Sequence, residues 1–453
     1  MPNREIQARQ GDEATGLGLG GYNPMTSESF QPIKGMADLA PPAIYLWQRL
    51  EETARDILAR YAFDEVRTPV MERTAVFKRS LGDTTDVVQK EMYSFTDRGG
   101  RDLSLRPEGT AGVIRHVAGS GQAAQDARLY YIGPMFRSER PQAGRYRQFH
   151  QLGVESIGAP CPAADAEVIA LQAHVLSAWG LKDFRMELNT RGLPEDRQRV
   201  ADGLRAALEP DLDRLCEDCR RRYAQNPLRI LDCKNAACRD IADRLPPVTE
   251  FMSAEARTYL KEVISLLERL EIPVTENPRL VRGLDYYVHT VWEITHAGLG
   301  SQDALSGGGR YALTFGNQTI EGVGFAMGLE RIITALTGQG LDPGSLAKPP
   351  SVWLISQGAA AFDENLVLMQ SLRLRGVSCA MDLRGRSMKA QMRAANRANS
   401  RYVVIRGDHE MEQGTFQLKN MADGVQEELD MPELMQRLTS GTDRVCPDTE
   451  EEE

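Results

Sequence analysis

The chain has 453 residues, of which 42% are hydrophobic and 26% are charged, and its formal net charge is −10 at pH 7. This length predicts roughly two to four domains, and the composition is typical of a soluble globular protein. The sequence has no long apolar run and no basic and apolar leader, which argues against a membrane-spanning or secreted protein and favours the cytoplasm, with no membrane partner.

The first elements are a polar extension, a helix and a strand. Residues 1–30 are polar and rich in glycine, and we expect them to form a flexible N-terminal extension. From Pro42 to Tyr61 the apolar residues recur at helical spacing, which predicts a helix. A strand is expected from Glu65 to Val70, and strand pattern returns at Lys90 to Phe95.

A loop that follows Pro107 carries two polar residues and a glycine. Proline ends a strand ladder, so we expect Glu108 and Thr110 to face a ligand, with Gly109 allowing close approach of the backbone. The same residues would also serve as a capping pair for a helix over 110–118. The local sequence leaves both interpretations open.

Residues 129–156 predict an antiparallel hairpin. Two β-prone stretches, Leu129 to Phe136 and Gln148 to Ser156, flank the turn-forming residues Pro141 to Gly144. Alternation along the second strand predicts one face bearing Arg145, Arg147, Phe149, Gln151, Gly153 and Glu155, and another bearing His150, Leu152, Val154 and Ser156. Arginine binds phosphate, an aromatic ring stacks on a base and a carboxylate recognises a polar small molecule. A solvated hairpin face would also be polar.

Residues 193–278 interrupt the strand pattern. A helix is expected from Asp165 to Trp179 and a strand from Phe184 to Asn189. Two helical stretches, 194–222 and 253–271, then predict a helical insertion between two strands of one sheet.

Four cysteines of this insertion have the spacing of a metal site. Cys216 and Cys219 are separated by two residues, and Cys233 and Cys238 by four. Four thiols at such spacing can hold a structural zinc ion. The alternative is ordinary cysteines, since the first pair lies in a strongly helical sequence.

Strands return after the insertion. One is expected from Leu280 to Val288, continuing through Val291 to Ile294. Three glycines between Ser306 and Tyr311 would weaken a strand unless something approaches the backbone there. Residues 322–331 predict a strand that runs into a helix.

The C-terminal part alternates strands and helices. After a linker at 341–350, this alternation over 351–440 predicts a small α/β domain with a partly parallel sheet, followed by an acidic tail at 441–453. Basic residues at a spacing of four form one stripe, made of Lys389, Arg393, Arg397 and Arg401. The stripe is either a solvated face or an RNA-binding surface, because a local positive field can hold RNA on an acidic protein.

Several motifs resemble the class II aminoacyl-tRNA synthetases. FRSE, a loop and RYRQF are similar to motif 2 of that class, and GRYRQFHQLGVE (144–155) and VRGLDYY (281–287) resemble its histidyl family. The helix and strand near 42–70 resemble motif 1, which forms a dimer interface, and 322–331 resembles motif 3. One departure is Ala312-Leu313-Thr314, where the family usually has Asp-Gly-Leu.

The resemblance implies a fold. We expect an α+β catalytic domain built on an antiparallel sheet with flanking helices (the class II synthetase fold) over 31–192 and 279–340. The helical insertion at 193–278 would divide it, and 351–440 would be an α/β anticodon-binding domain.

The resemblance also implies a reaction. It is the ATP-dependent ligation of L-histidine to tRNA(His) through histidyl adenylate, releasing AMP and pyrophosphate, with Mg²⁺ and as a homodimer. Arg137 and Arg282 would flank the reacting phosphate as catalytic residues.

The family's binding residues carry over position by position. Those for histidine are Glu108, Gly109, Thr110, Arg137, Gln151, Glu155, Arg282, Tyr286, Tyr287 and Gly308. Those for ATP are Arg137, Glu139, Arg145, Phe149 and Arg331. Those for tRNA are Arg140, Gln142, Lys389, Arg393 and Arg397.

Two other functions compete with this one. One is a catalytically inactive, histidine-binding regulatory paralogue, a subunit of ATP phosphoribosyltransferase. Such paralogues tend to lose the arginine of VRGLDYY and the C-terminal domain, and this chain keeps both. The other is a zinc-stabilised RNA-binding protein, which would not need Glu108, Arg282 and Arg331 together.

Overall fold

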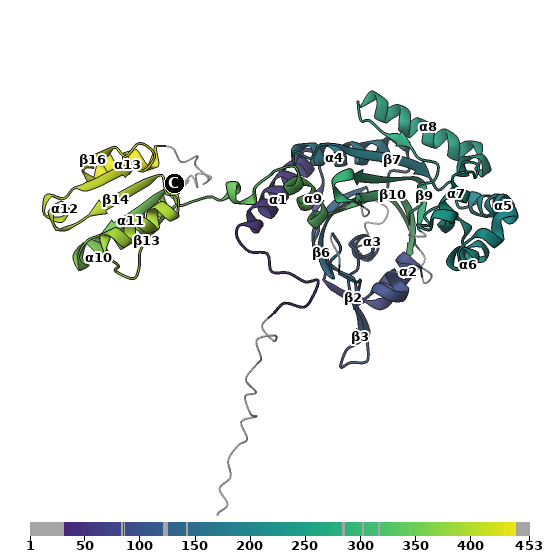
Figure 1. Cartoon of the computed structure of the whole chain (residues 1–453), viewed down its shortest axis with the longest axis horizontal. Helices are drawn as coiled ribbons and strands as arrows, with labels where there is room; N and C mark the ends of the chain where they lie inside the picture. Colours follow the sequence, from purple (N-terminus) through teal and green to yellow (C-terminus); the bar gives the residue numbers. More distant parts are fainter. Residues whose placement is uncertain are drawn as a thin grey trace, which may run out of the picture. The chain divides into compact units, whose positions relative to one another are not determined.

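The computed structural model describes residues 31–82, 85, 87–120, 126–141, 144–282, 286–300, 303–315 and 318–440. The chain divides into two compact units, Met1–Pro343 and Gly344–Glu453 (Figure 1). The boundary falls inside the segment expected as a linker. Over these ranges, no helix combines the length and apolar character that crossing a membrane requires.

The first unit is built on a large sheet. In its described residues this sheet has eight strands in the order β1-β5-β6-β11-β10-β9-β7-β8. Neighbours pair antiparallel except at the two edges, where β1 pairs with β5 and β7 with β8 in parallel. The strands are β1 (Asp64–Glu65), β5 (Ala127–Phe136), β6 (Gln148–Ile157), β7 (Phe184–Thr190), β8 (Thr275–Glu276), β9 (Tyr287–His296), β10 (Ala304–Phe315) and β11 (Gln318–Gly328). The expectation of an antiparallel sheet with flanking helices is confirmed.

The predicted hairpin is β5 and β6. Their ladder runs from Ala127 opposite Ile157 to Phe136 opposite Gln148. Leu152 and Val154 are fully buried, whereas Phe149, Gln151 and Glu155 line a cavity, as strand alternation predicted.

Helices cover both faces of the sheet. On one face α4 (Pro162–Ala178) is joined to the strands by Gln172, whose Oε1 accepts a 2.6 Å hydrogen bond from the Trp292 indole of β9. On the other face α2 (Thr74–Leu81) and α3 (Thr110–Gly119) pack Phe77 and Ile114 against Tyr311 of β10. The cavity lies on this second face. Two further helices, α1 (Ala43–Arg60) and α9 (Leu329–Gly338), also belong to this unit.

Three predicted strands differ from the structure. The strand at 65–70 is reduced to β1, because beyond it Thr68 offers its carbonyl to the Arg106 guanidinium rather than to a neighbouring strand. The strand at 90–95 begins only at Ser94, after the π-helical turn Val87–Glu91. This strand is β3 (Ser94–Thr96). It belongs to a small sheet in the order β2-β4-β3, whose other strands are β2 (Met71–Arg73) and β4 (Asp102–Leu105).

The third is the strand expected from Leu280, which begins at Tyr287. The Leu280 N–H instead closes a turn onto the Asn277 carbonyl at 3.0 Å. Residues 283–285, at the centre of VRGLDYY, lie outside the described part of the chain.

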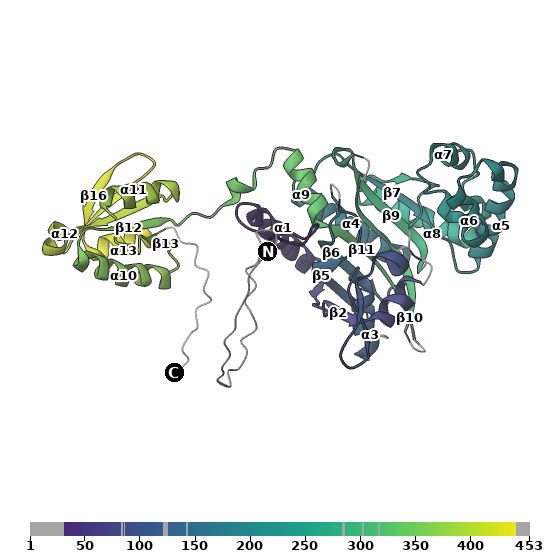
Figure 2. The same cartoon turned by 60° about the horizontal axis from the view of Figure 1, so that its bottom comes forward.

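The insertion is a cluster of short helices. It comprises α5 (Asp196–Leu208), η3 (Glu209–Arg214), α6 (Glu217–Gln225), η4 (Pro227–Ile230), α7 (Ala236–Ala242), η5 (Val248–Phe251) and α8 (Ala254–Arg269). Figures 1 and 2 show α5, α6 and α7 gathered beside α8 at the end of the sheet that carries β7 and β9. The helical stretch expected over 194–222 is broken, because Pro210 cannot donate its backbone N–H within a helix.

The second unit is a small α/β domain. Within its described residues, five strands lie in the order β13-β12-β14-β15-β16, parallel among the first three and antiparallel thereafter. The strands are β12 (Val352–Ser356), β13 (Cys379–Met381), β14 (Tyr402–Arg406), β15 (Phe416–Asn420) and β16 (Gln426–Leu429). Helices α10 (Ala359–Leu374) and α13 (Met431–Thr439) pack on one face and α11 (Met388–Arg397) on the other (Figure 2). The predicted partly parallel sheet is confirmed.

Candidate active site

A cavity of about 310 Å³ opens on the face of the large sheet that carries α3. Its walls come from the β5–β6 hairpin, the start of α3, β10, β11 and α9. Twelve of the residues carried over from the family line it: Glu108, Thr110, Arg137, Glu139, Arg145, Phe149, Gln151, Glu155, Arg282, Tyr286, Tyr287 and Arg331. Segments far apart in sequence therefore meet at one site.

Three arginines from separate segments converge on this cavity. Arg137 follows β5, donates to the Pro107 carbonyl at 2.9 Å and lies 5.2 Å from the Phe149 ring centroid. Arg331, on α9, donates to the carbonyls of Gly144 and Ala304. Arg282 pairs with Glu293 at 2.5 Å. Several fixed cations around one cavity suit a ligand with several anionic oxygens.

Glu108 both caps the start of α3 and lines the cavity. Its carboxylate accepts hydrogen bonds from the backbone N–H groups of Thr110 (2.8 Å) and Ala111 (2.9 Å), which caps α3. The same side chain lines the cavity. Burial raises the pKa of Glu108, and the two N–H donors and Arg137 oppose that rise only in part. A ligand cation would supply the missing stabilisation of the carboxylate.

The deep end of the cavity holds buried polar atoms that lack partners. Within the described residues, both carboxylate oxygens of Glu155, Oε1 of Gln151 and the hydroxyl of Tyr311 have no hydrogen bond of good geometry. Burial raises the pKa of Glu155 to about 8, and the nearby hydroxyls of Thr110 and Tyr311 oppose the rise only in part. Because unsatisfied buried polar groups are costly, this arrangement is suited to a ligand that offers both a donor and an acceptor.

Two of the glycines expected to bind histidine, Gly109 and Gly308, are packed closely against aromatic rings. A Cβ at Gly308 would collide with the buried Trp292 ring on the opposite face of the sheet, and of the three glycines at 307–309 it is Gly307 that lines the cavity. Likewise, a side chain at Gly109 would collide with the Tyr131 ring, so packing rather than ligand approach explains that glycine. Neither Gly109 nor Gly308 lines the cavity.

Two glutamates that hold side chains of the site, Glu293 and Glu330, were not predicted from the sequence. Glu293 lies opposite Gly307 in the β9–β10 ladder and binds Arg282. Glu330 on α9 accepts hydrogen bonds from the backbone and ring nitrogens of His150. Strand alternation was the available signal, but register across β9 and β10 cannot be read from either strand alone.

The residues expected to bind tRNA are distributed over both units. Arg140 is exposed and outside the cavity lining, and Gln142 lies outside the described residues. Lys389, Arg393 and Arg397 are all exposed along α11 of the second unit, followed by Arg401.

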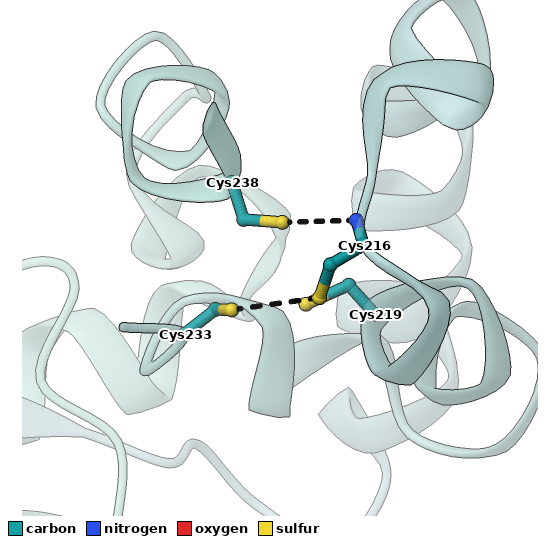
Figure 3. A group of neighbouring side chains, drawn as sticks. All are labelled: Cys216, Cys219, Cys233 and Cys238. Atoms are coloured by element: carbon teal, nitrogen blue, oxygen red, sulfur yellow. Dashed lines mark hydrogen bonds between the residues drawn. The ribbon is translucent and has the colours of Figure 1, made fainter. Parts of the chain in front are cut away.

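The four cysteines of the insertion come together, and none of them lines the cavity. Their Sγ atoms all lie within 4.8 Å of one another, in the residues Cys216, Cys219, Cys233 and Cys238 (Figure 3). The spacing in the sequence therefore corresponds to four thiols that lie close together in the structure.

Comparison with known proteins points to one family. Residues 35–332 match the family described as Histidyl-tRNA synthetase, and residues 351–440 match the family described as Anticodon binding domain. A protein named Histidine--tRNA ligase from Halothermothrix orenii is 45% identical over 415 residues, covering 89% of this chain and 98% of that protein.

Solved structures agree with this family. The crystal structure of apo S. aureus histidyl-tRNA synthetase has a TM-score of 0.76 and 32% identity, covering 90% of this chain and 100% of that one. A structure from Bacillus halodurans C titled as an ATP phosphoribosyltransferase regulatory subunit/histidyl-tRNA synthetase has a TM-score of 0.62 at 21% identity, covering 83% and 98%, and shows a shared fold alone. With its convergent arginines, its capped carboxylate and these matches, the chain belongs to the histidyl-tRNA synthetase family.

Proposed function

We propose that this chain is a histidine–tRNA ligase, which joins L-histidine to tRNA(His) with ATP in two steps. The first step forms histidyl adenylate and releases pyrophosphate, and the second transfers histidine to tRNA and releases AMP. The observation that carries this proposal is the meeting of Arg137, Arg282 and Arg331 around a cavity whose deep end has unpaired polar atoms.

The deep end would bind histidine. Glu108 is a buried carboxylate suited to the α-ammonium group, and Thr110 lies beside it. Gln151, Glu155 and Tyr287 would hydrogen-bond the imidazole, which has one donor and one acceptor when neutral. A site that hydrogen-bonds its substrate discriminates against analogues that lack the hydrogen-bonding group by a factor of roughly 10⁴ to 10⁵ in kcat/KM. It does so without a second site that hydrolyses wrong products.

The shallow end would bind ATP. Phe149 and Arg331 would enclose the adenine, Glu139 would recognise its edge, and Arg145 and Arg331 would hold the outer phosphates. Arg137 and Arg282 would flank the α-phosphate while the histidine carboxylate attacks it in line. Positioning of two anionic reactants can contribute about 7 to 11 kcal/mol, and oriented cations add to that.

Magnesium would neutralise the outer phosphates. This ion takes oxygen ligands, usually one or two carboxylates together with substrate phosphates. Outside the histidine end, the lining carboxylates are Glu139, paired with Arg145 at 2.9 Å, and Glu330, bonded to His150. Since both are engaged, the phosphates themselves would supply most of the ligands. None of the four clustered cysteines lines the cavity, so any zinc that they hold would be structural.

The proposed function also assigns roles to the domains, to the basic stripe and to a dimer interface. We place catalysis in 31–192 and 279–340, with the insertion at 193–278, a linker at 341–350 and anticodon recognition in 351–440. The stripe on α11 would contact tRNA. A cytoplasmic homodimer is proposed as well, with motif 1 at its interface. Val70, Met71 and Phe95, on and beside the small sheet, are exposed apolar residues that a partner would cover.

The test is aminoacylation of tRNA(His) with labelled histidine, together with histidine-dependent pyrophosphate exchange. Arg282→Ala should lower exchange about 10²- to 10³-fold, as expected for one positioned charge, while histidine binding stays measurable. Arg279→Ala is the control, since Arg279 is an exposed neighbour paired with Asp243. Histidine binding without exchange in the unaltered chain would instead favour the regulatory paralogue.

A further inference from the structure

Four thiols from separate segments of the insertion meet at one point (Figure 3). Cys216 directly precedes α6 and Cys219 lies in the first turn of that helix. Cys233 follows η4, and Cys238 lies in α7. None of them lines the cavity, so the proposed reaction leaves this cluster unexplained.

The sulfur separations suit a tetrahedral ion. With Zn–S bonds of about 2.3 Å, the sulfur atoms of a regular tetrahedron lie about 3.8 Å apart. The Sγ atoms of Cys216 and Cys233 are 3.9 Å apart, and no pair in the cluster exceeds 4.8 Å. Shifts of about 1 Å or less would therefore complete the coordination. All four residues are free cysteines, so no disulfide competes for the sulfur atoms.

The surroundings hold the sulfur atoms in place and leave a route to them. Cys219 and Cys238 are fully buried, whereas Cys216 and Cys233 are half-buried, which gives an ion an entry path. The backbone N–H of Cys216 donates to Sγ of Cys238 at 3.2 Å. Such bonds orient metal ligands and stabilise thiolate charge.

We propose that the insertion binds one zinc ion through Cys216, Cys219, Cys233 and Cys238, and that this ion fastens α6 to the η4–α7 segment. The core of the insertion is small, and two of its buried members are Cys219 and Cys238 themselves. Small units with little core commonly need a metal or disulfides for stability. Because four protein ligands close the coordination shell, the ion is structural rather than catalytic.

The experiment measures zinc in the full-length chain, expressed with zinc, purified without chelators and kept reduced. Elemental analysis should find one zinc per chain. A mercurial thiol reagent should release it, and removing it should lower the melting temperature until zinc is returned. Cobalt in its place should give the visible bands of a tetrahedral site and a sulfur-to-cobalt charge-transfer band.

Variants locate the site. Cys233→Ser and Cys219→Ser should lose the zinc, whereas Cys161→Ser and Cys379→Ser, which alter cysteines outside the cluster, should retain it. Cys219 is in the core, so Cys219→Ser could lose zinc simply because it misfolds. Cys233 is half-buried, and its substitution disturbs the core less. The cobalt spectrum is recorded on the unaltered chain and does not depend on any variant. The proposal is overturned if the folded, reduced chain takes up no zinc when zinc is supplied.

Discussion

Arg282 donates a hydrogen bond of 2.5 Å from Nη1 to Oε2 of Glu293, so that its guanidinium group lies over the bare backbone of Gly307. Gly307 is the partner of Glu293 in the β9–β10 ladder, which places all three residues at one point of the sheet. Burial alone would lower the pKa of Arg282, but the Glu293 carboxylate and the hydroxyls of Tyr287 and Tyr286 together outweigh it, and the pKa is raised. The pair therefore keeps a fully charged guanidinium in a fixed position at the cavity.

Replacing Gly307 should displace this guanidinium group. In Gly307→Ala the new methyl group would collide with Arg282, so we expect pyrophosphate exchange to fall about 10²-fold while the melting temperature changes little. Gly338→Ala is the control, because open space surrounds that position. Gly308→Ala should have the opposite profile, destabilising the fold through a collision with Trp292. Unchanged exchange in Gly307→Ala would remove the assigned role of Arg282.

Glu108→Gln should weaken histidine binding. The amide retains an acceptor for one N–H of α3 but loses the charge that would pair with an ammonium group. Hydrogen bonds to charged groups contribute about 1.5 to 3 kcal/mol, so the KM for histidine should rise roughly 10- to 150-fold while that for ATP stays constant. Steady-state pyrophosphate exchange measures both constants. An unaltered KM for histidine would mean that Glu108 only caps the helix.

Glu155 should make stability depend on pH. Its pKa is 4.5 in an exposed environment and about 8 in the folded chain, so between these values the folded state holds a proton that the unfolded state has released. Stability should therefore fall as pH rises through this interval, by about 1.4 kcal/mol per pH unit for this one group. Glu155→Gln should remove this contribution.

Urea unfolding of both chains across the same interval measures the difference in slope. Burial also raises the pKa of Glu108 and Glu293, which adds slope of the same sign to both chains, so the comparison isolates Glu155. Glu52→Gln, an exposed substitution on α1, serves as the control. Parallel curves for the unaltered and Glu155→Gln chains would contradict the raised pKa.

Substitutions in the basic stripe on α11 should weaken tRNA binding and leave adenylate formation unchanged. Replacing Lys389, Arg393 and Arg397 together by alanine should raise the KM for tRNA and leave pyrophosphate exchange unchanged. If each side chain contacts one phosphate, the slope of log affinity against log salt should fall by about 0.7 to 0.9 per residue. Arg375→Ala is the matched control, an exposed arginine at the C-cap of α10 in the same unit. Equal salt slopes would indicate a solvated face.

The sequence by itself determined the elements with strong periodicity and the letters that identify the family. The helix at 42–61, the hairpin strands and the alternating C-terminal elements all follow from neighbouring residues, because helical and strand periods are local properties. The same holds for Glu155 and Phe149, whose shared face follows from alternation along β6.

Tertiary structure alone decided which side chains meet. The choice of Gly307 over Gly308, the pairing of Glu293 with Arg282 and the contact of Tyr131 with Gly109 depend on register and packing between distant segments. The four thiols likewise become a cluster only when α6 and α7 pack together. Local sequence cannot specify such contacts, since a one-residue change of register would turn each strand's side chains to the opposite face.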